Sequence, residues 1–286
     1  MKPPSLPEGL DEDDVDGLIS RALAEDLGEA GDITCAAVIP PGVRFSGVMA
    51  ARQEMVVAGL PLAARVFAAL SGDISFEALV EDGGKVSAGD VLARLEGPAA
   101  ALLSAERVAL NLLQHLSGIA SETRRYVEAI AGTGAVLLDT RKTIPGLRRV
   151  EKYATRMGGA ANHRMGLYDA ILIKDNHLAV SGSVSEAVRR AKAAGHAEIE
   201  VECDTLEQVR EALEAGATRL LLDNMAPPML REALALTGGR VKTEASGGVT
   251  LESIRGIAET GVDFISVGRI TQSAPAVDIG LDWQAA

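Results

Sequence analysis

The chain has 286 residues, of which 47% are hydrophobic and only 3% aromatic, so it can bury a large core made mainly of Ala, Leu, Val and Ile. Its formal net charge of −12 argues against nonspecific binding to nucleic acids and against anchoring on anionic membranes. The two cysteines, Cys35 and Cys203, are too few and too far apart for a disulfide framework or a zinc site. The polar start of the chain and the lack of any apolar run of roughly 18 residues predict a soluble cytoplasmic protein.

The N-terminal third mixes helical and strand-like patterns. Residues 1–14 are rich in proline and acidic side chains, and we expect them to form a loose arm. Apolar residues at helical spacing predict a helix over 15–27. A second helix is expected over 61–70, inside the otherwise strand-like region 45–95. This part of the chain is therefore expected to be an α/β unit.

A long helix is expected over residues 99–131. Apolar residues cover much of its surface, so it should be buried or lie at an interface. Arg107 is unusual on such a helix and either pairs with a neighbouring glutamate or serves a functional site. Gly118 suggests a bend in this helix and a boundary between two domains, 1–118 and 119–272.

From residue 135 onward the chain repeats one unit, in which a short aliphatic strand, polar residues and an amphipathic helix closed by glycine follow one another. The expected strands are 135–138, 170–173, 198–201, 219–222, 240–243 and 263–267. The expected helices are 184–194, 206–215, 228–236 and 251–260. This alternation predicts a parallel sheet with helices outside it, and six strands in succession favour a barrel over an open sheet.

Polar residues directly follow each expected strand. They are Asp139 to Lys142, Lys174 and Asp175, Glu202, Asp223 and Asn224, Glu244 with 246–248, and Gly268 with Arg269. The C-terminal ends of the strands in a parallel barrel meet at one mouth, where ligands bind. We therefore expect these residues to form one site.

This mouth is expected to have a basic half and an acidic half. The basic half consists of Arg141, Lys142, Arg164 and Lys174. Arginine pairs can bind carboxylates bidentately, and lysine adds a point charge. In the acidic half, Glu202 and Asp223 can hold Mg²⁺ through their oxygens or through water, usually together with substrate phosphates.

Two small turns near the end of the repeats suit a phosphate. They are Ser246-Gly247-Gly248 and Ser266-Val267-Gly268. Backbone N–H groups are exposed in such turns, and late barrel loops often bind phosphate. The sequence therefore predicts a ligand that carries carboxylates and phosphates and requires a divalent cation.

The segment 158–177 holds the densest group of polar residues. His163 lies next to Arg164 and is the best candidate for a functional histidine. His177 either caps or orients the loop of Lys174. The apolar run between these groups reads as a short buried strand.

Four motifs carry a resemblance to a known family. They are Glu106–Asn111, Asp139–Thr143, Asn162–Asp169 and Ile173–His177. Over nearly its whole length the chain resembles quinolinate phosphoribosyltransferase. The resemblance implies an N-terminal α/β sandwich domain over 1–118, onto which 273–286 packs, and an incomplete parallel α/β barrel over 119–272. It also implies a homodimer with active sites shared between the subunits.

The resemblance implies that the chain joins quinolinate to phosphoribosyl pyrophosphate with Mg²⁺, and yields nicotinate mononucleotide, pyrophosphate and CO₂ in de novo NAD biosynthesis. The implied carboxylate-binding residues are Arg107 from the neighbouring subunit, Arg141, His163, Arg164 and Lys174. The implied donor-binding residues are Thr140, Lys142, Glu202, Asp223, Ser246, Gly247, Gly248, Ser266, Val267 and Gly268. Among them Lys142, Glu202 and Asp223 are the implied catalytic residues, and Glu202 and Asp223 bind the metal, partly through water.

The sequence departs from the family pattern at three places. Ala160 stands where a third glycine is usual, Gly248 where asparagine is common, and Arg269-Ile270 where Ala-Leu is common. These changes bear on phosphate binding more than on the reaction.

Three alternative functions are consistent with the same scaffold: a nicotinate phosphoribosyltransferase, a homologue associated with molybdate transport, and a binding protein without catalysis. The four basic residues of the mouth favour a substrate with two carboxylates over nicotinate, which has one. The intact 174–177 cluster argues against the second alternative, and the retention of Glu202 and Asp223 argues against the third.

Overall fold

The computed structural model describes residues 5–284 and divides into two compact units. Unit one comprises the chain up to Arg124, the segment Ile144–Gly159 and the chain from Thr271 onward. Unit two comprises Arg125–Thr143 and Ala160–Ile270. Within the described residues, no helix is long and apolar enough to cross a membrane.

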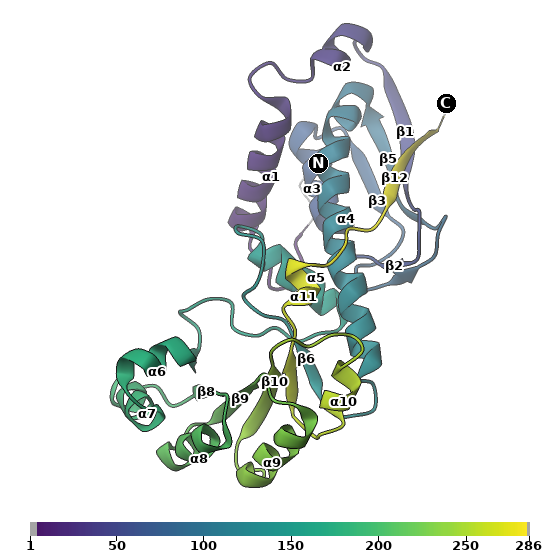
Figure 1. Cartoon of the computed structure of the whole chain (residues 1–286). Coiled ribbons are helices and arrows are strands. Elements are labelled where there is room, and N and C mark those ends of the chain that lie inside the picture. The colour runs from purple at the N-terminus through teal and green to yellow at the C-terminus, as the bar shows by residue number, and fades with distance from the viewer. Residues whose placement is uncertain (1–4, 285–286) are drawn as a thin grey trace. The chain divides into compact units, whose positions relative to one another are not determined.

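Unit one is built on an antiparallel sheet with helices packed against it (Figure 1). The order of its strands is β12-β1-β5-β3, and a separate ribbon pairs β2 with β4. Its strands are β1 (Arg44–Ala51), β2 (Met55–Val56), β3 (Ser75–Ala78), β4 (Lys85–Val86), β5 (Val91–Pro98) and β12 (Ile279–Gln284). Its helices are α1 (Glu12–Leu27), α2 (Ile33–Val38), α3 (Leu60–Leu70), α5 (Arg148–Gly158) and most of α4 (Ala99–Ala129).

The core of unit one joins helix α4 to the sheet. Leu102 and Leu113 of α4 are fully buried together with Met49 of β1 and Leu95 of β5. Each such leucine contributes about 1.5–3 kcal/mol by leaving water. Arg107 lies on an exposed part of the same helix, next to Glu106.

The boundary between the units differs from the predicted one at residue 118. Helix α4 runs through Gly118 without a break, and a Cβ at this glycine would lie only 2.1 Å from the Pro275 carbonyl oxygen. Gly118 therefore allows a close approach of the chain rather than a bend. Helix α5 was assigned to the barrel, but Val150 and Ala154 bury it in the core of unit one.

Unit two contains a six-stranded parallel sheet in the order β6-β11-β10-β9-β8-β7. The strands are β6 (Val136–Leu138), β7 (Ile171–Ile173), β8 (Ile199–Cys203), β9 (Arg219–Asp223), β10 (Lys242–Ser246) and β11 (Phe264–Ser266). The helices are α6 (Asp175–Ser181), α7 (Val184–Ala193), α8 (Leu206–Ala215), α9 (Pro227–Thr237), α10 (Ile254–Ala258) and α11 (Arg269–Gln272). Within the described residues β6 and β7 remain the two ends of the sheet, as an incomplete barrel requires.

Each strand of unit two sends alternate side chains to opposite faces of the sheet. In β8, Ile199 and Val201 are fully buried in the apolar core that the strands share with the helices, as is Cys203. Glu200 and Glu202 lie between them in sequence and therefore point to the inner face. The helix–sheet core thus leaves the inner face available for polar groups.

One predicted strand is shifted, with a consequence for the site. Strand β10 begins at Lys242 rather than at residue 240, because Gly238 and Gly239 adopt positive φ after α9 and Arg240 bonds back to Thr237. Glu244 was predicted to follow this strand. It lies instead in the middle of it and is fully buried.

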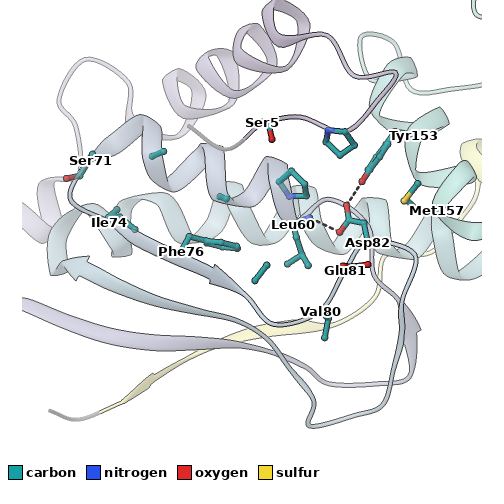
Figure 2. A pocket seen from close by; sticks show the side chains of 16 residues that line it. Ser5, Leu60, Ser71, Ile74, Phe76, Val80, Glu81, Asp82, Tyr153 and Met157 are labelled. Carbon is teal, nitrogen blue, oxygen red and sulfur yellow. Dashed lines mark hydrogen bonds between the residues drawn. The ribbon is translucent and has the colours of Figure 1, made fainter. Parts of the chain in front are cut away.

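Unit one contains an apolar pocket of about 550 Å³ beside α3 and β3 (Figure 2). Its apolar lining includes Leu60, Ile74, Phe76, Val80 and Met157. At one end Asp82 accepts hydrogen bonds from the Tyr153 hydroxyl at 2.6 Å and from the Gly59 N–H at 2.7 Å. Because Asp82 is engaged in the fold and no predicted site residue lines the pocket, we assign it no ligand.

Candidate active site

Two loops of unit two meet beside the ends of β6 and β11. The Lys142 N–H donates to Thr140 Oγ1 at 3.0 Å, which closes the first loop into a tight turn. A Cβ added at Gly268 would lie 2.8 Å from Lys142 Cδ, so the second loop passes directly against it. The predicted residues Thr140, Lys142 and Gly268 are therefore neighbours.

A second meeting of loops lies at the ends of β9 and β10. Asp223 and Ser246 face each other in the parallel register, and the Asn224 N–H donates to the Ser246 carbonyl at 2.9 Å. Gly247 has φ +92°, and a Cβ there would lie 2.2 Å from Asn224 Oδ1. Gly248 has φ +59° with no atom within 4 Å of such a Cβ. The turn at 246–248 is thus tight on one side and open on the other.

The acidic and basic groups of the site are in contact at Lys174. Its Nζ lies 2.5 Å from Oε2 of Glu202, whose side chain is 8% exposed. Burial raises the pKa of Asp223, and the charges of Glu202 and Asp204 raise it further, while Lys174 opposes the change. Three carboxylates therefore share one region of negative potential with a single lysine.

His177 holds the loop of Lys174. The Lys174 N–H donates to His177 Nδ1 at 2.8 Å, at the start of helix α6. His177 is the third residue of α6 and Lys174 its N-cap, so this one hydrogen bond both caps the helix and orients the loop, the two roles predicted for this histidine.

The charge of the Arg141 guanidinium acts on the guanidinium of Arg164 in the site. Burial lowers the pKa of Arg164, and the positive charge of Arg141 lowers it further, while Glu200 and Asp169 oppose the change. A hydrogen bond from Arg164 Nη1 to the Ala170 carbonyl at 3.1 Å helps to hold the side chain. A bound dianion would relieve this repulsion, and arginine pairs suit carboxylates.

Asp139 fixes the segment that carries His163 and Arg164. It is fully buried and accepts hydrogen bonds from the His163 N–H at 2.8 Å and from Asn162 Nδ2 at 2.6 Å. The Arg164 N–H then donates to His163 Nδ1 at 2.7 Å. His163 Nε2 points toward Glu200 and Glu244. Both ring nitrogens therefore face protein groups.

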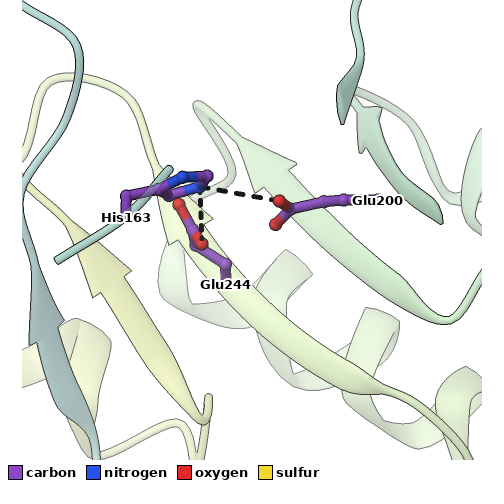
Figure 3. A group of neighbouring side chains, drawn as sticks. All are labelled: His163, Glu200 and Glu244. Atoms are coloured by element: carbon purple, nitrogen blue, oxygen red, sulfur yellow. Dashed lines mark ion pairs between the residues drawn. The ribbon is translucent and has the colours of Figure 1, made fainter. Parts of the chain in front are cut away.

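Sequence reasoning missed two residues of the inner face, Glu200 on β8 and Arg219 on β9, and placed Glu244 after its strand rather than within β10 (Figure 3 draws the two glutamates with His163). Burial and the charge of Glu244 together raise the pKa of Glu200 to about 7, against the opposing effects of Arg219 and His163. Burial alone would also raise the pKa of Glu244, but its contacts with His163, Arg219 and Ser266 outweigh burial and lower it.

A signal for these residues was present in the sequence. Glu200 and Glu202 stand two apart in a five-residue strand and so share one face. Polar residues at such spacing in a central strand indicate a polar barrel interior. We did not use this pattern, because we interpreted each charged residue as one that follows a strand.

The other predicted phosphate turn, 266–268, begins with residues that are buried and hydrogen-bonded. Ser266 is 4% exposed and hydrogen-bonds Glu244, and the Val267 N–H donates to the Leu138 carbonyl at 3.0 Å. Arg107, the predicted carboxylate ligand from a neighbouring subunit, belongs to unit one.

Together, a parallel α/β sheet with a polar inner face, paired guanidinium groups and carboxylates at the strand ends defines an α/β-barrel enzyme for anionic ligands. Two family models match the chain: the quinolinate phosphoribosyl transferase C-terminal domain over residues 119–282 and the N-terminal domain over residues 32–117. The chain belongs to the quinolinate phosphoribosyl transferase family.

Individual proteins agree with the family models. A probable nicotinate-nucleotide pyrophosphorylase [carboxylating] of Bacillus subtilis is 46% identical over 93% of this chain and 92% of its own length. Quinolinate phosphoribosyltransferase [decarboxylating] 1b of Nicotiana tabacum is 41% identical over 98% of this chain and 84% of its own. The solved nicotinate-nucleotide pyrophosphorylase of Francisella tularensis superposes with a TM-score of 0.93 at 38% identity, covering 98% of this chain and 100% of that one.

Proposed function

We propose that this chain transfers the phosphoribosyl group of phosphoribosyl pyrophosphate to quinolinate and releases pyrophosphate and CO₂. The product is nicotinate mononucleotide, in de novo NAD biosynthesis. The names of the curated relatives support this reaction. The single structural observation that carries it is that Arg141 and Arg164 bring two positive charges into one site, where the charge of Arg141 acts on Arg164, and such a pair suits a ligand with two carboxylates.

The quinolinate carboxylates bind to Arg141, Arg164 and Lys174 in this proposal. Lys174 sits between these carboxylates and Glu202, so it can respond to charge on either side. Lys142 contacts the phosphoribosyl donor, and its 5′-phosphate binds at the turn 246–248 and at Gly268, since the Val267 N–H is already bonded to Leu138.

A divalent cation fits the acidic side of the site. The charges of Glu202 and Asp204 act on Asp223, and Lys174 and a hydrogen bond with Ser246 oppose their effect. Oxygen ligands of this kind suit Mg²⁺, which supplies positive charge to the leaving pyrophosphate. We assign Glu202 and Asp223 to this role, in part through water.

The remaining chemistry follows from charge. The ribosyl centre becomes positively charged as pyrophosphate leaves, and the carboxylates of Glu202 and Asp223 stabilise that charge. Loss of CO₂ leaves negative charge beside the ring nitrogen, and a quaternised nitrogen stabilises it. Phosphoribosyl transfer therefore precedes decarboxylation. Free nicotinate that accumulates during turnover would count against this order.

The experiment that tests the function is product analysis with phosphoribosyl pyrophosphate, Mg²⁺ and either quinolinate or nicotinate. Nicotinate mononucleotide and CO₂ from quinolinate alone support the proposal. Product from nicotinate alone points to a nicotinate phosphoribosyltransferase. The absence of product from either overturns the proposal in favour of the molybdate-associated or binding alternatives.

The diacid site has its own test. Arg141→Ala should raise the quinolinate KM by roughly 10- to 100-fold, because a charged hydrogen bond contributes about 1.5–3 kcal/mol. Arg189→Ala is the matched control, since Arg189 is an exposed arginine of α7 paired with Glu186. An unchanged quinolinate affinity in Arg141→Ala would overturn the assignment.

The assembly that we propose is a cytoplasmic homodimer in which Arg107 of one subunit enters the partner's site. The exposure of Arg107 on an otherwise apolar helix supports this role. Arg107→Ala and Lys174→Met should each be inactive alone. Mixing and refolding the two variants together should restore activity, because the hybrid dimer has one intact site. The failure of the mixture to recover activity would contradict shared sites.

A further inference from the structure

The inner face of the unit two sheet carries a buried charged network that the reaction does not require by direct contact. Glu244 is fully buried, Glu200 is 6% exposed, and the Arg219 side chain is 27% exposed. Buried charges carry a large desolvation cost, and replacing such networks by apolar residues is often stabilising. Stability alone is therefore a weak explanation of this cluster.

The two glutamates of this network lie close to the imidazole ring of His163. Arg219 Nε lies 2.9 Å from Glu200 Oε1, its Nη2 pairs with Glu244, and its guanidinium stacks over Phe264 with 4.3 Å between Cζ and the ring centroid. His163 Nε2 lies 3.5 Å from Glu200 Oε2 and 3.4 Å from Glu244 Oε2 (Figure 3). The two carboxylates thus bridge Arg219 and the ring.

The same three ligand-type side chains could suggest a metal centre, since ligand atoms of His163, Glu200 and Glu244 lie within 4.8 Å of one another. The guanidinium of Arg219 already occupies the position of the compensating cation and contacts both carboxylates. A divalent ion there would face this fixed positive charge. We therefore interpret the cluster as an ion-pair network of side chains rather than a metal centre.

The other side of the ring connects the network to the diacid site. His163 Nδ1 accepts from the Arg164 N–H at 2.7 Å, so Nδ1 carries no proton and Nε2 carries the hydrogen that faces the carboxylates. Asp139 anchors the His163 N–H from the opposite direction. The backbone that carries the Arg164 guanidinium is thereby held at two points against the repulsion from Arg141.

We propose that Glu200, Arg219 and Glu244 are positioning residues that fix the tautomer and orientation of His163 and, through it, aim Arg164 at a carboxylate of the diacid. This inference rests on the proposed function for the identity of the diacid. It assigns His163 a role through Arg164 rather than a substrate contact of its own. Each residue acts from behind the site, within unit two.

The first test reads the tautomer directly in the wild-type protein. The chain has four histidines, so a long-range ¹H–¹⁵N spectrum can be assigned by comparison with His163→Asn. His163 should appear as the neutral Nε2–H tautomer at pH 7 to 8. An Nδ1–H tautomer or an imidazolium would overturn the proposal, whatever the enzyme activity.

The second test separates positioning from general damage. Glu244→Gln keeps the shape of the side chain and removes its charge, and it should raise the quinolinate KM about tenfold or more while the phosphoribosyl pyrophosphate KM changes less than threefold. The His163→Asn variant keeps an acceptor for the Arg164 N–H and loses the Nε2 contact, and it should show the same split. Equal effects on both KM values would overturn the proposal.

The double variant shows whether the residues act in series. His163→Asn with Glu244→Gln should be no worse than the more severe single variant, because both remove the same support. Additive effects would contradict action through His163. If wild type shows no reaction with quinolinate, the proposed function fails, and the tautomer measurement still decides the inference. If wild type is active and Glu244→Gln leaves the quinolinate KM unchanged, the inference alone fails.

Discussion

Lys174 Nζ lies 2.5 Å from Glu202 Oε2, and the two side chains differ sharply in their exposure. The lysine side chain is 43% exposed, whereas the glutamate side chain is 8% exposed. This pair joins the basic and acidic halves of the site. If Glu202 is removed, the exposed lysine can be hydrated, whereas if Lys174 is removed, the buried glutamate cannot.

The asymmetry predicts unequal losses of stability. Lys174→Met leaves a buried carboxylate without its ammonium partner, whereas Glu202→Gln leaves an ammonium that can reach water. We expect Lys174→Met to be more destabilising, by about 1 kcal/mol, since an unpaired buried charge costs more than a solvated one. Urea unfolding without substrate or metal measures the difference. A greater loss in Glu202→Gln would show that the pair is not organised by burial.

Adjacent glycines in the 246–248 turn should respond differently to substitution. Gly247→Ala places a Cβ 2.2 Å from Asn224 Oδ1 at φ +92°, so we expect a loss of about 1–3 kcal/mol and a raised KM for the phosphoribosyl donor. Gly248→Asn should be tolerated within about 0.5 kcal/mol, because asparagine accepts left-handed backbone and nothing lies within 4 Å. Donor KM values and thermal melts compare the two. Similar damage from both substitutions would refute this reading of the turn.

Two helical glycines make a matched pair for a test of close packing. Gly118→Ala directs a methyl group at the Pro275 carbonyl oxygen, with 2.1 Å between them, and should be destabilising by about 3 kcal/mol or prevent folding. Gly256→Ala in α10 meets nothing within 4 Å and should be stabilising by about 0.5–1 kcal/mol through helix propensity. Chemical denaturation gives both values. A neutral Gly118→Ala would mean that the chain around residue 275 yields easily.

Asp32 predicts a pH dependence of stability in unit one. It caps α2 through the Cys35 N–H and bonds the Ser104 hydroxyl, and these hydrogen bonds, that of Cys35 foremost, lower its pKa to about 2. Because the folded pKa lies below the usual value near 3.9, the contribution is present above pH 4 and is lost as pH falls toward 2. The stability of wild type relative to Asp32→Asn should therefore shrink between pH 4 and pH 2 in urea titrations. A constant difference would exclude Asp32 as the titrating group.

Much of the fold follows from local patterns. The helices at 184–193 and 206–215 begin at side-chain caps, Ser183 and Thr205, and the second ends at left-handed Gly216, so their bounds were predicted closely. The fold class was confirmed as an incomplete parallel α/β barrel with an N-terminal domain. These features depend on neighbouring residues, which a single sequence displays directly.

Other features depend on contacts between distant residues. Gly118 looks like a helix breaker until the chain at Pro275 comes against it, and Val150 belongs to unit one only because of its packing there. Glu244 was predicted to follow a strand, because the local sequence does not show that the turn at Gly238 and Gly239 delays the start of β10 to Lys242. The contact of His163 with Glu200 and Glu244 could not be predicted for the same reason, since these glutamates come from separate strands, although the spacing of Glu200 and Glu202 indicates a polar face on β8.

The pairing of β12 with β1 places the end of the chain next to a strand that is made near its beginning. Trp283 packs edge-on against Phe45 with 4.2 Å between ring centroids, and all of unit two is synthesised between these two residues. During translation β1 therefore has β5 on one side and a bare edge on the other, a form prone to aggregation. Because β12 pairs with β1, the sheet of unit one can be completed only after unit two has been synthesised, so the barrel has time to fold first.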